Sequence, residues 1–108
     1  MNIDNFTKNY KIFLNKPLYR YEQESILRKN LKNANPADEL VIVMEELAEL
    51  TQQISKKLRG EENKMHLLEE IADVDICLEQ LKLLCGFTDK EIEAARSVKL
   101  HRLNTGNN

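Results

Sequence analysis

The scarcity of helix-breaking residues is the feature that most restricts what this chain can fold into. Only two prolines and three glycines interrupt its 108 residues, and each falls where a patterned segment begins or ends. Because proline starts helices and glycine commonly ends them, the long segments between these residues are expected to be helical. The sequence therefore predicts an all-α fold, an antiparallel helical bundle of about four to five helices.

Local end signals divide the chain into five predicted helices. They cover about 4–14, about 18–31, 36–58, the segment between Asn63 and Gly86, and the segment from Thr88 to about 103. Asn35 before Pro36, and Asn63, are residue types that cap a helix start, and Thr88 with Glu91 matches a capping box. The letters LYRY at 18–21 also alternate as a strand does, which leaves a strand as the alternative there. Residues 1–103 are expected to form one domain, with 104–108 as a flexible tail.

Composition and charge exclude several classes of protein. With 42% hydrophobic and 31% charged residues, the chain matches one small globular domain. A net charge of −2 gives no basic field, so stable nucleic-acid binding is not expected. No apolar run has membrane-spanning length and no signal peptide is recognisable, which predicts a cytoplasmic protein without a membrane partner. Cys77 and Cys85 are too far apart on one helix to bridge and are expected to be reduced core thiols.

Apolar residues follow both long predicted helices. On 36–58 they form one stripe, made of Leu40, Val43, Leu47, Leu50, Ile54 and Leu58. The next helix is apolar nearly all round, with Leu67, Ile71, Val74, Leu78, Leu81 and Cys85 on one side and Leu68, Ala72, Ile76 and Leu83 on the other. A chain of this length cannot bury such a helix by itself, so the pattern predicts completion of the bundle by oligomerisation, as a homodimer or homotetramer.

Two pairs of carboxylates lie beside these apolar surfaces. Glu46 and Glu49 are three residues apart on one helix, and Glu70 and Asp73 are three residues apart on the next. Ionised carboxylates near buried surface are costly unless they are paired or bind a cation. On adjacent antiparallel helices these four can surround one or two hard cations, and an all-oxygen set suits Mg²⁺ or Mn²⁺.

Spacing alone leaves the choice of carboxylates open. Glu45 with Glu49, and Glu69 with Asp73, also share a helix face at four-residue spacing. Glu45 projects further from the apolar stripe than Glu46 does, which favours Glu46. A further alternative is that these acids are solvated or paired with lysines.

Two stretches of sequence carry a family resemblance. "EELAELTQQISKKLRGE" followed by "LLEEIADVDI" resembles the all-α nucleotide pyrophosphohydrolases of the MazG-like superfamily, in which ExxE on one helix is followed by ExxD on the next. The resemblance covers about 36–103 and identifies Glu46, Glu49, Glu70 and Asp73 as the catalytic metal ligands. It implies hydrolysis of a nucleoside triphosphate to monophosphate and pyrophosphate with Mg²⁺, for which Mn²⁺ can substitute, as part of nucleotide-pool housekeeping.

The same resemblance suggests roles for residues around these ligands. Glu49 is a candidate to accept the proton of the attacking water, and Glu69 a candidate to contact the ligands without binding the metal. The pyrophosphate oxygens need cationic partners. The candidate phosphate-binding residues are Lys56, Lys57, Arg59, Lys99 and Arg102.

Three other functions compete with this interpretation. A phosphoribosyl-ATP pyrophosphohydrolase has the same motif logic with a different substrate. A di-iron carboxylate bundle also uses glutamates on facing helices but needs ExxH, and the sequence lacks the required histidines. The third alternative is a non-catalytic helical oligomer or partner-binding module.

Overall fold

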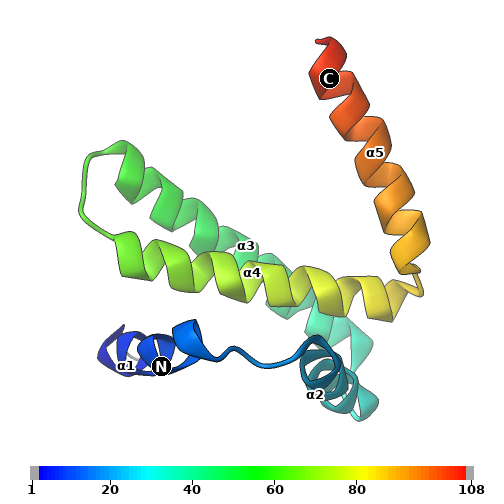
Figure 1. The fold of residues 1–108 in the computed structure, drawn as a ribbon, viewed down its shortest axis with the longest axis horizontal. Helices are drawn as coiled ribbons and strands as arrows, with labels where there is room; N and C mark the ends of the chain where they lie inside the picture. The colour runs from blue at the N-terminus through cyan, green and yellow to red at the C-terminus, as the bar shows by residue number, and fades with distance from the viewer. Residues whose placement is uncertain (1–2, 107–108) are drawn as a thin grey trace.

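The computed structural model describes residues 3–106 and confirms the all-α prediction. Within this range there are five helices and no strand: α1 (Ile3–Asn15), α2 (Arg20–Lys32), α3 (Pro36–Leu58), α4 (Lys64–Cys85) and α5 (Asp89–Thr105) (Figure 1). The strand alternative at 18–21 is wrong, because Tyr19 is the residue that precedes α2 and Tyr21 lies inside it.

An antiparallel hairpin of α3 and α4 forms the centre of the molecule (Figure 1). The buried apolar side chains are Val43 of α3 and Val74 and Cys77 of α4. Helices α1 and α2 each pack on α4, while α5 packs on none of the other described helices. The hairpin therefore holds the shared core, and α4 is the element on which α1 and α2 depend.

Two of the three predicted helix starts are capped as expected. The Asn35 side chain accepts hydrogen bonds from the backbone N–H groups of Ala37 (2.9 Å) and Asp38 (3.2 Å). At α5 the Glu91 N–H donates to the Thr88 hydroxyl (3.1 Å), and the Thr88 N–H donates to the Glu91 carboxylate (2.9 Å). These bonds satisfy amides that a helix start leaves unpaired, which explains why the helices begin where they do.

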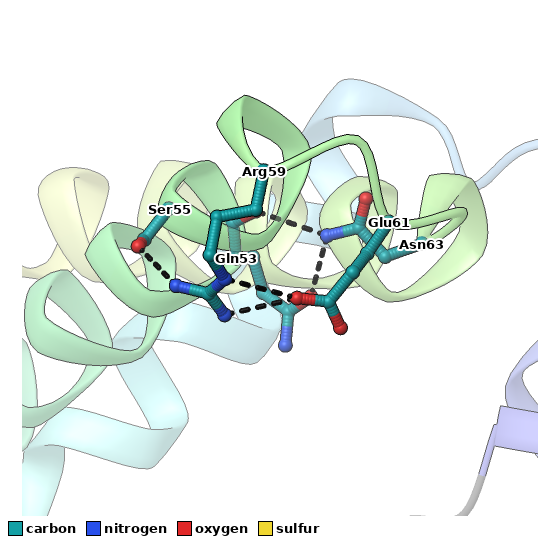
Figure 2. A network of polar contacts seen from close by, with 5 residues as sticks. All are labelled: Gln53, Ser55, Arg59, Glu61 and Asn63. Atoms are coloured by element: carbon teal, nitrogen blue, oxygen red, sulfur yellow. Dashed lines mark hydrogen bonds and ion pairs between the residues drawn. The ribbon is translucent and has the colours of Figure 1, made fainter.

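The third predicted cap is wrong in its mechanism. Asn63 precedes α4, but its side chain makes no capping hydrogen bond. Its amide nitrogen instead donates to the backbone carbonyl and to the side-chain carbonyl of Gln53, both at 2.9 Å (Figure 2). Asn63 is only 7% exposed, so a buried donor ties the start of α4 to the end of α3.

The last helix is longer than predicted. It continues through Asn104 and Thr105 to Gly106, which adopts a left-handed conformation with φ 78°. The first two residues assigned to a flexible tail are therefore helical, whereas 107–108 lie outside the described residues. Glycine adopts this conformation readily, which is why it ends the helix.

Much of the apolar surface predicted to be core is exposed in the single chain. Val43 of the α3 stripe is buried, but Ile54 is 54% and Leu58 87% exposed. The reason is the rotation of the helix: α3 meets α4 along the line of Val43, Glu46 and Gln53, so Ile54 and Leu58 lie outside the contact. The surface area of 8795 Å² compares with about 6,200 Å² expected for a compact monomer of this mass.

Two further predictions can be compared with the structure. Both cysteines are free, but only Cys77 is buried while Cys85 is exposed, so the core prediction is wrong for Cys85.

Among residues 3–106, no helix combines the length and the apolar character needed to cross a membrane.

Candidate metal centre

Three of the four predicted carboxylates come together between α3 and α4. One carboxylate oxygen from each of Glu46, Glu49 and Glu70 lies within 4.8 Å of the others. Three-residue spacing puts Glu46 and Glu49 on one side of α3, and antiparallel pairing brings Glu70 of α4 beside them. The sequence thus gathers three acids at one point of the hairpin.

Two oxygens of this cluster are buried without a hydrogen-bond donor. They are Oε2 of Glu46 and Oε2 of Glu70. A buried carboxylate oxygen that has lost water and gained no donor raises the free energy of the folded state. The arrangement is relieved by a proton or by a cation, and oxygen clusters of this kind suit hard divalent cations.

The pKa values of these carboxyls are raised, as expected for acids confined together. Burial raises the pKa of Glu70 to about 7, and the charges of Glu49, Asp73 and Glu46 add to the shift. Burial, followed by the charges of Asp73 and Glu49, raises the pKa of Glu46. Without a cation, the cluster consequently retains a proton close to neutral pH.

Asp73 and Glu69 lie beside this cluster rather than in it. Asp73 is not among the three carboxylates whose oxygens lie within 4.8 Å of one another. Burial first, then the charges of Glu69 and Glu49, raises the pKa of Asp73. Asp73 is thus electrostatically coupled to the centre, and Glu69 acts on it through Asp73.

The structure resolves which acid of α3 belongs to the cluster. Glu45 is exposed and takes no part in it, whereas Glu46 is one of its three members. Across the described residues, no lysine or arginine forms an ion pair with Glu46, Glu49 or Glu70. The alternative of lysine-paired acids is therefore wrong for these three.

The candidate phosphate-binding residues are divided between the end of α3, the α3–α4 loop and α5. Arg59 donates to Glu61 (2.9 Å) and to the Ser55 hydroxyl (2.7 Å), which holds it in the α3–α4 loop (Figure 2). Lys56 and Lys57 lie in the last turn of α3. Lys99 and Arg102 belong to α5, which packs on no other described helix, so one chain does not bring them to the carboxylates.

The sequence predicted Cys77 as a core thiol and Asn63 as a helix cap, but it did not predict that Cys77 lies near the carboxylates or that Asn63 contacts Gln53. Burial, followed by the charges of Glu46 and Asp73, raises the pKa of the Cys77 thiol. The register that sets Glu46 beside Glu70 also sets Gln53, seven residues later, beside Asn63, seven residues earlier. The register of the two helices is therefore the signal from which the contact between Gln53 and Asn63 could have been predicted.

Comparisons with protein-family models, curated proteins and solved structures find no match to this chain.

Proposed function

We propose that this chain is a Mg²⁺-dependent nucleotide pyrophosphohydrolase that converts nucleoside or deoxynucleoside triphosphates to monophosphates and pyrophosphate. The observation that carries the proposal is the pair of buried, donor-free oxygens of Glu46 and Glu70 inside a cluster of three carboxylates. These acids stand at the ExxE and ExxD positions of the MazG-like resemblance. A role in nucleotide-pool housekeeping follows from the proposed reaction.

The carboxylates fit a hard divalent cation. Glu46, Glu49 and Glu70 would hold Mg²⁺ or Mn²⁺, with Asp73 close enough to act on them electrostatically. A bound cation would neutralise the triphosphate and acidify the attacking water. Without it the negative cluster would repel the substrate, so cation dependence follows from the charge of the site.

The proposed reaction is a displacement at the α phosphorus. A water oxygen forms the new bond to phosphorus, the bond from that phosphorus to the bridging oxygen breaks, and pyrophosphate leaves with the electron pair. Glu49 is the exposed member of the cluster, which makes it the carboxylate best placed to take the proton from water.

Cationic contacts to the leaving pyrophosphate are proposed for Lys56 and Lys57, since they belong to the helix that carries Glu46 and Glu49. Lys99 and Arg102 would take part only if a second copy of the chain supplied them.

We also propose that the chain acts as a homodimer or homotetramer. The support is the exposed apolar surface of α3 and α4, which includes Ile54, Leu58 and Ile71.

Chromatography of nucleotide panels tests the reaction directly. Ribonucleoside and deoxyribonucleoside triphosphates, with phosphoribosyl-ATP as a further substrate, would be incubated with the full chain and either Mg²⁺ or EDTA. We expect monophosphate plus pyrophosphate with Mg²⁺ only. Diphosphate plus orthophosphate would refute the cleavage position, and turnover of phosphoribosyl-ATP alone would identify that substrate instead. No turnover of any nucleotide would favour a non-catalytic helical oligomer.

A further inference from the structure

Helix α5 leaves the hairpin without covering any of it. The turn that directs it contains Gly86, whose φ of 74° suits glycine, and the capping box of Thr88 and Glu91. In Figure 1, α5 extends away from the end of α4, and it packs on no other helix within the described chain. A helix in this position is stabilised only by its own hydrogen bonds and caps.

One face of α5 combines apolar and basic side chains. Ile92, Ala95, Arg96, Lys99 and Leu100 line a shallow hollow along it. Leu100 is 54% exposed. Neither Arg96 nor Lys99 forms an ion pair with any described residue. This face therefore offers uncovered aliphatic groups together with two unpaired cations.

A groove of about 680 Å³ lies between the end of α1, the α1–α2 connection, α2, α4 and the start of α5. Its apolar lining includes Phe13, Leu18, Ile26, Leu27, Ile76, Leu83 and Phe87. Glu79 also lines the groove. It follows Glu70 by nine residues, and at about 100° per residue this places the two side chains on opposite sides of α4. The groove is therefore on the side of α4 opposite the carboxylate cluster.

The charges of the groove complement those of α5. Two of its acids are already paired, Glu24 with Arg28 at 3.0 Å and Glu79 with Arg20 at 3.5 Å. Its two remaining acids, Asp75 and Asp89, have no ion-pair partner among residues 3–106. An apolar groove with two unpaired carboxylates matches an apolar helix face with two unpaired cations.

We infer that α5 of one copy lies in this groove of a second copy, and that the exchange is reciprocal. The α5 of the same chain is directed away by its own turn, whereas a two-fold related copy can present the same helix to the groove. The single chain exposes about 2,600 Å² more surface than a compact monomer of its mass. That excess is larger than the roughly 800 Å² per partner buried in a standard interface.

Exchange of α5 between two copies would determine which cations of the proposed hydrolase can bind phosphate. Seated in the groove, Arg96 and Lys99 would face Asp75 and Asp89 on the side of α4 away from the carboxylate cluster. Lys56 and Lys57 then remain as the cations available to phosphate. The exchange itself is measured by mass and cross-linking, so its failure and the failure of nucleotide hydrolysis are separate results.

Charge reversal tests the pairing. We expect Arg96→Glu or Asp75→Arg to raise the dissociation constant of the assembly about tenfold or more, measured by light scattering across a dilution series. The double variant, which restores opposite charges, should recover most of the loss. Lys90→Glu, on the opposite face of α5, is the matched control. Because α5 packs on no other helix, circular dichroism should show each α5 variant folded.

Photo-cross-linking locates the contact. A benzophenone amino acid at position 100, in a mixture of ¹⁵N-labelled and unlabelled full-length chains, should form mixed-isotope adducts to residues 18–28 or 72–89. Adducts confined to one chain, adducts to the α3 surface at 40–58, or a monomeric mass at all concentrations would each overturn the inference. So would an assembly that Arg96→Glu and Asp75→Arg leave unchanged.

Discussion

Glu70 combines burial with repulsion from its neighbours, which gives the metal-free protein a defined pH response. Its pKa is raised to about 7 from an ordinary value of 4.5, so between these values the folded chain binds more protons than the unfolded chain. The free energy of unfolding therefore decreases as the pH rises through that window. We expect the urea midpoint in EDTA to be lower at about pH 7.5 than at about pH 5.

Two amide substitutions separate Glu70 from the other carboxyls. Glu70→Gln should raise the urea midpoint near pH 7.5 and weaken the pH dependence, because it removes a charge that folding confines. Glu45→Gln, at an exposed position, should leave both unchanged. A midpoint that rises with pH between about 5 and 7.5 would contradict the role given to Glu70.

Neighbouring glutamates on α3 provide a matched test of the catalytic assignment. Glu46→Gln removes a buried carboxylate from the cluster, whereas Glu45→Gln changes an exposed one. We expect Glu46→Gln to lower kcat/KM by more than about 100-fold, beyond the 10–100-fold typical of residues that only orient metal ligands. Equal activity of the two variants in a pyrophosphate-release assay would remove Glu46 from the site.

For single residues, the sequence predicted which acids lie close together, but it did not predict their exact arrangement. The three-residue spacing and the apolar stripe were enough to prefer Glu46 over Glu45. Position along the helix did not reveal that Asp73 lies beside the cluster while the other three close within 4.8 Å. Side-chain reach and the rotation of α4 decide that distance, and neither is encoded in spacing.

At the scale of the helices, closure of the α3–α4 hairpin depends on the Asn63 side chain as a hydrogen-bond donor. Aspartate caps helices about as well as asparagine but has no N–H group to offer Gln53. We therefore expect Asn63→Asp to destabilise the fold by about 2–3 kcal/mol, because acceptors would then face acceptors in a buried position. Urea denaturation measures the loss, with Glu62→Ala at the exposed neighbour as control. An unchanged midpoint would mean that the two hydrogen bonds to Gln53 contribute little.

Helix boundaries were predictable because their signals are local. Asn35 with Pro36, and Thr88 with Glu91, act within three or four residues, and the structure has helices where these pairs predict them. The partner of each helix face was not predictable in the same way. The α3 stripe and the position of α5 depend on contacts between distant segments, so Leu58 is exposed and Lys99 lies on a helix that packs on no other described helix.

The molecule as a whole is expanded for its length. Its radius of gyration is 16.2 Å, compared with about 13 Å for a compact domain of this size. If assembly completes the fold, stability must depend on protein concentration. We expect tenfold dilution to lower Tm by about 3–5 °C, as monitored by circular dichroism. A Tm independent of dilution, together with a monomeric mass, would show that the expanded chain is stable alone.

The dependence of α1 and α2 on α4 sets an order of events during synthesis. Both helices pack only on α4 among the described elements, and α4 ends at Cys85. Because α1 and α2 are synthesised before α4, they have no partner until α4 has been made. The α3–α4 hairpin, joined by Asn63 and Gln53 only ten residues apart, can close quickly. Helices α1 and α2 are thus synthesised before the α3–α4 hairpin but reach their final contacts after it.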